Sequence, residues 1–185
     1  TSGSTGQPKG VMIDHQGAVN TILDINTRFE ITNKDKVLAL SSLNFDLSVY
    51  DIFGILATGA TIVIPPPNAS REPKEWFELI QREAITVWNS VPTLMKMLVE
   101  YCKGNNERKL TSLTKVLLSG DWIPLVLPQE IKEVAENAEL ISLGGATEAS
   151  IWSIYYPIKE IKPEWKSIPY GKPLTNQTFY ILDNN

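Results

Sequence analysis

The chain has 185 residues, of which 43% are hydrophobic and 21% charged, and its formal net charge is −4 at pH 7. This balance is typical of a globular protein with one sizeable core, and it excludes a basic surface for nucleic acid or for a membrane. The single cysteine, Cys102, excludes an internal disulfide, and no apolar run reaches the ~20 residues of a membrane span. We therefore expect a cytoplasmic protein that binds neither nucleic acid nor a membrane.

Short β-branched or apolar runs alternate along the chain with amphipathic segments of helical period. In chain order the sequence predicts a helix over 15–26, a strand over 37–41, a helix over 48–57 with Ser48 as its N-cap, a strand over 61–64, a helix over 73–83, a strand over 86–89, a helix over 91–101, and strands over 115–119, 139–143 and 178–182. This order favours an α/β fold with mainly parallel sheets layered with helices. Ligands gather at the carboxyl ends of such strands, here after Ser41, Asn89, Ser119 and Leu143.

The first ten residues, TSGSTGQPKG, are crowded with glycines and hydroxyl residues. Glycines let backbone N–H groups converge, hydroxyls add donors and Lys9 adds charge, which favours a polyphosphate ligand over the alternative of a flexible surface loop. The spacing is not that of a Walker loop. The run resembles the phosphate loop of the adenylate-forming enzymes: acyl-CoA synthetases, luciferases and the adenylation domains of nonribosomal peptide synthetases. The resemblance implies an ATP-binding loop with Lys9 as a catalytic residue, made of Thr1, Ser2, Gly3, Ser4, Thr5, Gly6 and Lys9.

A second motif, LNFDLSVYD over residues 43–51, follows the strand predicted at 37–41. By itself Asp46 could be a helix N-cap or a loop acid. The motif is similar to the one that identifies amino-acid-activating family members, in which the aspartate pairs with the substrate's α-ammonium group. A largely buried ammonium needs a fixed carboxylate, whereas fatty-acyl and aryl acids carry no such cation. Asp46 therefore favours amino-acid activation over an acyl- or aryl-CoA ligase.

A third motif, GGATE over residues 144–148, follows the strand predicted at 139–143. It resembles the family's core motif, which implies that Thr147 contacts phosphate, that Glu148 helps to hold Mg²⁺, and that both are catalytic. A carboxylate beside polyphosphate is repulsive without a metal, although a solvated surface acid is the alternative. The resemblance also places Gly144, Gly145 and Ala146 at the nucleotide.

The GGATE motif departs from the usual family pattern at two positions. Most peptide-synthetase members have tyrosine where Gly144 stands, stacked on adenine, and proline where Ala146 stands. Another residue must therefore cover that face of adenine here. The variant resembles the subgroup of adenylation domains that feed thiazoline-forming modules. A fourth match, IPYGKP over residues 168–173 with Asn176 and Tyr180, fits the stretch that ends this part of the family fold.

The family lines its side-chain pocket with residues at fixed offsets from these motifs. The resemblance implies that the pocket consists here of Asp46, Leu47, Tyr50, Asn89, Leu117, Ser119, Leu143, Ile151 and Trp152. With Asp46 paired to the ammonium group, the other pocket residues are mostly apolar. The aromatic rings of Tyr50 and Trp152 narrow the pocket, and Asn89 and Ser119 add two small polar groups. This predicts a small or medium, uncharged side chain. The set is similar to the signature associated with L-cysteine, whose soft thiol tolerates apolar walls better than a serine hydroxyl would.

Two residues that invite a catalytic interpretation are better explained as structural. His15, the single histidine, stands beside a predicted helix start, where family members often carry an unused histidine. Cys102 stands near a predicted helix end, away from the motifs, and we expect a small packed residue. One histidine and one cysteine support neither a catalytic triad nor a metal cluster.

The resemblance as a whole implies a reaction, its partners and the place of this chain in a larger protein. An amino acid would react with ATP and Mg²⁺ to give aminoacyl-AMP and pyrophosphate. A phosphopantetheine thiol of a peptidyl carrier protein would then take the aminoacyl group, beside a condensation or heterocyclisation domain. A non-catalytic nucleotide-binding domain is the rival from another class. We expect residues 1–185 to be part of the large N-terminal domain of the adenylate-forming fold, truncated at both ends, without the C-terminal lid, and inactive by themselves.

Overall fold

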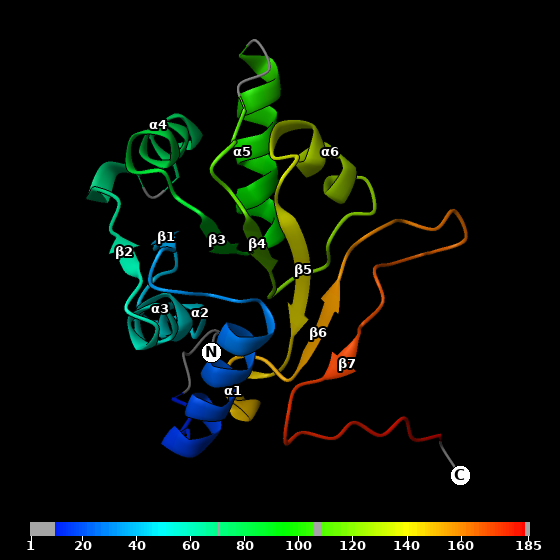
Figure 1. The fold of residues 1–185 in the computed structure, drawn as a ribbon. Helices are drawn as coiled ribbons and strands as arrows, with labels where there is room; N and C mark the ends of the chain where they lie inside the picture. Colours follow the sequence, from blue (N-terminus) through cyan, green and yellow to red (C-terminus); the bar gives the residue numbers. More distant parts are fainter. Residues whose placement is uncertain (1–9, 70, 106–108, 184–185) are drawn as a thin grey trace.

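The computed structural model describes residues 10–69, 71–105 and 109–183, and within them it confirms the predicted α/β fold (Figure 1). Seven strands form one sheet in the order β2-β1-β3-β4-β5-β6-β7. Neighbouring strands from β2 to β5 are parallel, and β6 and β7 continue the sheet antiparallel. The strands are β1 (Lys36–Leu38), β2 (Thr61–Val63), β3 (Val87–Ser90), β4 (Lys115–Leu118), β5 (Glu139–Gly144), β6 (Ile154–Pro157) and β7 (Lys172–Pro173).

Helices cover both faces of the sheet, so the molecule has three layers (Figure 1). One face carries α4 (Pro73–Glu83), α5 (Pro92–Gly104) and α6 (Leu127–Val134). The other face carries α1 (His15–Arg28) and a continuous helical segment formed by α2 (Leu47–Val49), the π-helix η1 (Tyr50–Gly54) and α3 (Ile55–Ala57). Two single-turn 3-10 helices are η2 (Pro67–Ala69) and η3 (Thr147–Ala149).

The alternation of side chains along β3 explains why the sheet has a core on each face. Trp88 points towards α4 and α5 and packs edge-on against Trp76, with ring centroids 5.8 Å apart. Val87, one residue earlier, belongs to the opposite core with Ile25 and Tyr50. All four residues of β3 are buried, as expected for a parallel strand covered by helices on both sides. The second core, on the α1 side, is the one that adjoins the site.

Several expected elements differ from the structure. The helix predicted over 48–57 is divided by the π-helix η1. Ser48, the expected N-cap, lies inside α2 instead, and its hydroxyl donates to the Phe45 carbonyl. The strand predicted over 178–182 is wrong. None of the described strands lies beside this exposed segment, and an extended apolar run becomes a strand only by pairing (Figure 1). The sequence prediction missed α6, β6 and β7.

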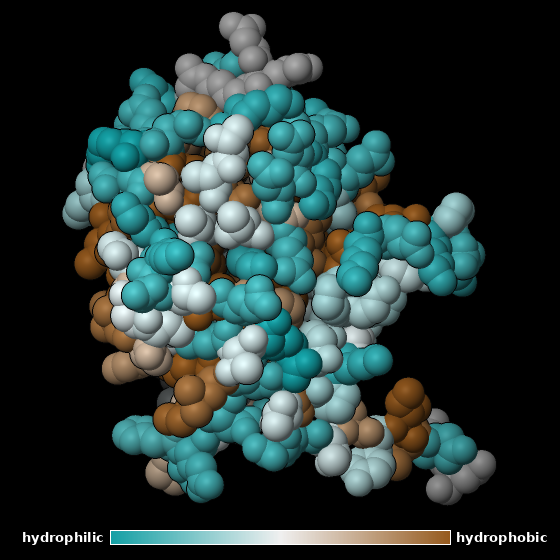
Figure 2. All heavy atoms as spheres, viewed as in Figure 1, coloured by the Kyte–Doolittle hydropathy of each residue, from teal (hydrophilic) through white to brown (hydrophobic). Residues whose placement is uncertain are grey.

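Hydrophobic side chains on the visible face gather at one edge and near the C-terminal segment, and most of the rest is hydrophilic (Figure 2). Ile181 and Leu182 are among the most exposed large hydrophobic residues of the described chain. None of the described helices has both the length and the apolar character needed to cross a membrane.

Candidate functional site

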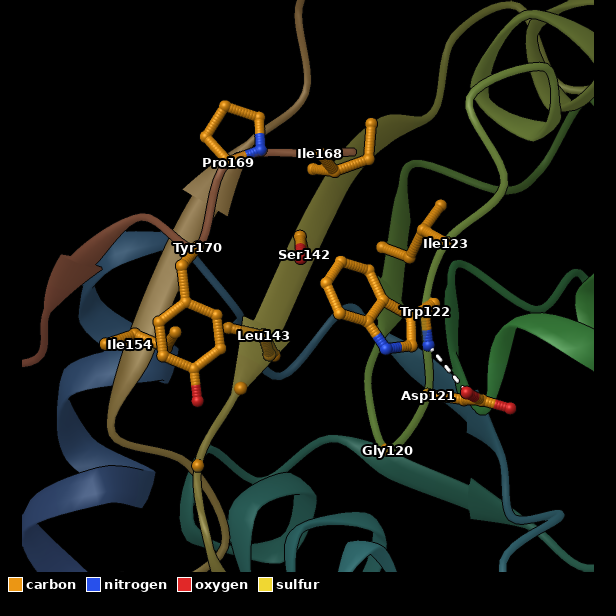
Figure 3. Close-up of a pocket in the computed structure, with 12 residues that line it drawn as sticks. Gly120, Asp121, Trp122, Ile123, Ser142, Leu143, Ile154, Ile168, Pro169 and Tyr170 are labelled. Carbon is orange, nitrogen blue, oxygen red and sulfur yellow. Dashed lines mark hydrogen bonds between the residues drawn. The ribbon is translucent and has the colours of Figure 1, made fainter. Parts of the chain in front are cut away.

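Two adjoining cavities lie where β4 and β5 end. The larger has a volume of about 400 Å³ and is lined by residues 120–123, 142–145, 154 and 168–170 (Figure 3). The smaller, of about 70 Å³, is lined by residues 45–47, 119–120, 144–145, 147 and 151–152. They share Gly120, Gly144 and Gly145. This is the edge at which parallel α/β sheets bind their ligands.

A hydrogen bond joins the second and third sequence motifs at the smaller cavity. The Thr147 hydroxyl donates to Oδ2 of Asp46 over 2.6 Å, although the two residues are 101 positions apart. Asp46 stands directly before α2, but its side chain caps no helix N–H. The N-cap alternative for this carboxylate is therefore wrong. The carboxylate instead faces the cavity beside Thr147.

The nine residues expected to form the substrate pocket divide into three groups. Five line the smaller cavity: Asp46, Leu47, Ser119, Ile151 and Trp152. Leu143 lines the larger one. Three are buried and line neither: Tyr50, Asn89 and Leu117. Strand alternation turns Leu117 and Leu143 towards the core on the α1 side, and the same period places Asn89 and Ser119 on that face.

A strained turn presents Ile151 and Trp152 to the smaller cavity. Ser150 and Ile151 both have positive φ, 68° and 73°, which is unusual for residues other than glycine and especially for a β-branched one. The buried Thr21 hydroxyl of α1 lies 2.9 Å from the Ser150 carbonyl oxygen and 3.3 Å from that of Trp152, so it can donate to either. The Trp152 ring then packs against Tyr50, with centroids 5.0 Å apart. Thr21 therefore anchors the turn that shapes one wall of the cavity.

Replacing Thr21 by valine keeps its shape but removes this donor. We expect Thr21→Val to lower the free energy of unfolding by about 1–3 kcal/mol, because the buried turn loses the hydroxyl donor shared by the Ser150 and Trp152 carbonyls. Urea unfolding measures the loss. Thr61→Val, at an exposed position on β2, is the matched control and should stay within about 0.5 kcal/mol of the wild type. Equal effects of the two substitutions would show that Thr21 does not hold the turn.

Behind the smaller cavity lies a buried polar cluster. Tyr50 donates to Oδ1 of Asn26 over 2.9 Å, and Asn26 Nδ2 donates to the Gly54 carbonyl over 2.8 Å. Burial raises the pKa of Tyr50 well above its usual value, and the charges of Asp51 and Asp35 raise it further. Burial also raises the pKa of Asp51 to about 7, although hydrogen bonds from Asn89 and Ser41 oppose this shift.

The larger cavity has aromatic side chains on two sides. Trp122, in the loop after β4, is 77% exposed, and Tyr170, in the loop before β7, is 67% exposed. Figure 3 shows Tyr170 on one side of the cavity and Trp122 on the other, with Ser142 and Leu143 between them. A Cβ atom at Gly144 would lie 3.0 Å from Ile154 Cδ1 and 3.3 Å from Tyr170 Cε2. The ring of Tyr170 thus covers the face of Gly144 that the motif leaves without a side chain.

The remaining predicted nucleotide and metal residues are placed only in part. Glu148 is exposed on η3 and Ala146 directly precedes that turn. No group of three or more acidic, histidine or cysteine side chains is placed to hold a metal within the described residues. A single carboxylate nevertheless fits Mg²⁺, which usually takes its other ligands from phosphate and water. Lys9 and the other loop residues, Thr1, Ser2, Gly3, Ser4, Thr5 and Gly6, lie outside the described residues.

Sequence reasoning missed several residues that the structure brings to the cavities. Phe45 and Gly120 line the smaller one, and Trp122 and Tyr170 flank the larger. Gly120 and Trp122 directly follow the strand predicted at 115–119, so its carboxyl end already pointed to them. Tyr170 stood inside the IPYGKP match without a role. Asp51 closes the second motif, and nothing in the sequence indicated its burial beside Asn89.

Comparison with known proteins places the whole chain in one sequence family. The family model described as AMP-binding enzyme matches residues 1–185. Bacitracin synthase 1 of Bacillus licheniformis is 55% identical over 185 residues, which is 100% of this chain and 3% of the synthase. Pyochelin synthetase PchF of Pseudomonas aeruginosa is 50% identical over 183 residues, which is 99% of this chain and 10% of the synthetase. The chain thus spans a small part of the curated relatives it matches.

A solved structure shares the fold closely. The crystal structure of the nonribosomal peptide synthetase FmoA3 in its α-methyl-L-serine-AMP-bound form is 47% identical, with a TM-score of 0.91. The match covers 97% of this chain and 20% of that one.

Proposed function

Because the chain belongs to the AMP-binding enzyme family, we propose that the protein that carries it activates an amino acid with ATP. The products are aminoacyl-AMP and pyrophosphate, and the aminoacyl group then passes to a phosphopantetheine thiol on a carrier protein. The observation that carries this proposal is the 2.6 Å hydrogen bond between Thr147 and Asp46. It sets a carboxylate suited to an ammonium group directly beside a hydroxyl suited to a phosphate.

In this reaction a carboxylate oxygen of the amino acid attacks the α-phosphorus of ATP. The bond from that phosphorus to the bridging oxygen breaks, and pyrophosphate leaves with the electron pair. Asp46 holds the ammonium group, which fixes the carboxylate for attack, and the Thr147 hydroxyl gives up its hydrogen bond to Asp46 to donate to a phosphate oxygen instead. Glu148 would hold Mg²⁺, which neutralises phosphate charge when bound. Positioning and charge neutralisation are what such phosphate chemistry requires of a protein.

The larger cavity suits the adenine base. Its volume of about 400 Å³ is ample for a flat heteroaromatic group, and Tyr170 and Trp122 offer ring faces. The cavity shares Gly144 and Gly145 with the smaller one, so a nucleotide held there would extend its phosphates towards Thr147. In this arrangement Tyr170 takes the place of the tyrosine that the GGATE motif lacks.

Removing the Tyr170 ring should weaken ATP binding selectively. We expect Tyr170→Ala to raise the KM for ATP about 10-fold, because base–aromatic stacking contributes roughly 1–3 kcal/mol, and to leave the KM for the amino acid within about twofold. Steady-state exchange assays with each substrate varied in turn measure both constants. Tyr180→Ala, which removes an exposed ring that lines neither cavity, is the matched control. A rise in both constants by the same factor would contradict this role.

The smaller cavity supports cysteine as the amino acid. It holds about 70 Å³, and Asp46 is the sole charged residue of its described lining, so a small uncharged side chain fits. The wall made by Leu47, Ile151 and Trp152 is apolar, which suits a thiol. The FmoA3 structure contains an adenylate of α-methyl-L-serine, which also has a small side chain with one polar group. Serine is therefore the first competitor to test.

The test is ATP–pyrophosphate exchange by the complete natural polypeptide that contains this chain. Cysteine, serine, alanine, a fatty acid and an aryl acid are compared at equal concentration. Exchange with cysteine well above serine and alanine is the expected result. Exchange with another amino acid would retain the reaction and contradict the cysteine assignment. Signal with the fatty or aryl acid alone would indicate an acyl- or aryl-CoA ligase, and ATP binding without any exchange would indicate a non-catalytic domain.

A further inference from the structure

A buried side-chain pair outside the cavity lining links the π-helix to the sheet. Asn89 on β3 is 0% exposed and Asp51 on η1 is 1% exposed. Nδ2 of Asn89 lies 2.8 Å from Oδ1 of Asp51, the ordinary length of a hydrogen bond to a carboxylate. No step of the proposed reaction uses Asp51. A buried carboxylate without such a use calls for a physical explanation.

The chemistry of the pair fixes which way the Asn89 amide points. An ionised carboxylate only accepts hydrogen bonds, so the NH₂ group of Asn89 must face Asp51 and the amide oxygen must face away. Ionised Asp51 thus fixes an amide orientation that atom positions alone leave open. A hydrophobic residue at position 51 would leave Asn89 free to turn over.

Six buried side-chain polar atoms have no hydrogen-bond partner among the described residues, and Asp51 Oδ2 and Trp152 Nε1 are among them. Asn89 Oδ1 and Ser119 Oγ are both buried and have no hydrogen-bond partner among the described residues. Asn89 and Ser119 stand at the ends of neighbouring parallel strands, on the same face as Leu117, and Ser119 lines the smaller cavity. Buried polar atoms are nearly always satisfied in complete sites. An amide oxygen that only accepts and a hydroxyl that can accept or donate, on the same face of the sheet, are matched by a ligand O–H or S–H group.

We propose that Asp51 is a positioning residue that holds the Asn89 amide oxygen towards the side chain of the bound amino acid, and so sets a preference for a side chain with a hydrogen-bond donor. This inference rests on the proposed function. The substrate thiol or hydroxyl donates to Asn89 Oδ1 and accepts from the Ser119 hydroxyl. An isosteric side chain that ends in a methyl group leaves both atoms unsatisfied and binds less well.

The preference should depend on pH because Asp51 must be ionised to hold the amide. Its pKa is raised to about 7 by burial. Below that pH the protonated acid can donate to the amide oxygen, and the amide loses its fixed orientation. Tyr50 is the titratable neighbour of Asp51, and the charge of Asp35 also raises the pKa of Tyr50. Asn89 and Ser41 are the neutral hydrogen-bond partners of Asp51. The discrimination should therefore fall as the pH drops through 7.

The experiment compares cysteine with 2-aminobutyrate, which has a methyl group in place of the thiol. Exchange kcat/KM is measured for both, between pH 5.5 and 8, with the complete wild-type polypeptide and with Asp51→Asn. The wild type should favour cysteine about 10-fold at pH 8 and less at pH 6. In Asp51→Asn the new amide can either accept from Asn89 Nδ2 or donate to Asn89 Oδ1, so the orientation is no longer fixed. The ratio should fall and no longer change with pH, through a lower value for cysteine, with that for 2-aminobutyrate within about threefold of the wild type. The ratio of serine to 2-aminobutyrate, measured in the same way, should depend on pH and on Asp51 as the cysteine ratio does.

A second variant and a stability measurement keep the result unambiguous. Asn89→Leu removes the acceptor itself and should abolish the same preference. Asp51→Asn should raise the Tm more at pH 8 than at pH 5, because the native state of the wild type binds a proton that the unfolded state has already lost between pH 4 and 7. An unchanged ratio and pH profile in Asp51→Asn would overturn the inference while leaving amino-acid activation intact. A wild-type ratio that does not change across pH 7 would also overturn it. Failure of the proposed function is a separate result: wild-type polypeptide that gives no exchange with any amino acid.

Discussion

Asp46→Ala is expected to reduce exchange with the preferred amino acid by at least about 100-fold in kcat/KM. The substrate ammonium would be left in a partly enclosed site without its counter-ion, and removing one partner of such a pair costs about 3 kcal/mol or more. The KM should rise and kcat should fall, because Asp46 holds the ammonium group in the ground state and thereby also orients the substrate carboxylate for attack. Exchange assays over a range of amino-acid concentrations measure the loss.

The control variants separate the charge of Asp46 from its shape and from its effect on folding. Asp46→Asn keeps an acceptor for Thr147 but removes the charge, and it should be nearly as impaired as the alanine variant. Because Asp46 caps no helix N–H, thermal unfolding of both variants should stay close to the wild type. Glu160→Ala, at an exposed acid away from the cavities, should leave exchange unchanged. Full amino-acid exchange by Asp46→Ala would contradict its role as the ammonium partner.

The parallel part of the fold could be predicted because its signals are local. Buried parallel strands appear as short apolar runs, and α5 shows apolar residues at helical period, so both were found. The antiparallel edge could not be predicted in the same way. Strand β7 has two residues, which carry no periodicity, and its pairing depends on β6 arriving beside it. The segment 178–182 has the composition of a strand but no described neighbour to pair with, and composition cannot report that.

Site residues could be predicted where a motif follows a strand end. Contacts between distant segments could not be predicted, because they depend on tertiary packing. Asp46 and Thr147 were found separately, but their direct contact depends on how the chain returns after more than a hundred residues. The covering of Gly144 by Tyr170 joins two distant loops, and no spacing rule connects them. Asp51 reads in the sequence as an ordinary helix acid. Its raised pKa arises from burial under the surrounding layers, which the local sequence does not encode.

Gly145→Ala is expected to cause the largest combined loss of stability and activity. Gly145 has a φ of 155°, a conformation that L-residues rarely adopt. A Cβ atom there would lie 2.7 Å from the Ser153 backbone nitrogen and 3.0 Å from two backbone atoms of Trp152. The Ser153 N–H donates to the Gly144 carbonyl over 2.7 Å and closes the loop that carries Thr147, so the backbone itself would have to move. We expect about 2–4 kcal/mol of lost stability by urea unfolding.

The activity of Gly145→Ala distinguishes a general loss of folding from displacement of the site. Below the denaturation temperature, the folded enzyme should still lose at least about 10-fold in kcat with every amino acid, because the backbone shift that relieves the Cβ contact displaces Thr147 relative to Asp46 and alters both cavities. Gly104→Ala is the matched control. No heavy atom lies within 4 Å of its added Cβ, so stability should be equal or slightly higher and exchange unchanged. A folded Gly145→Ala enzyme with wild-type kcat would show that the backbone position of this loop does not control catalysis at the two cavities.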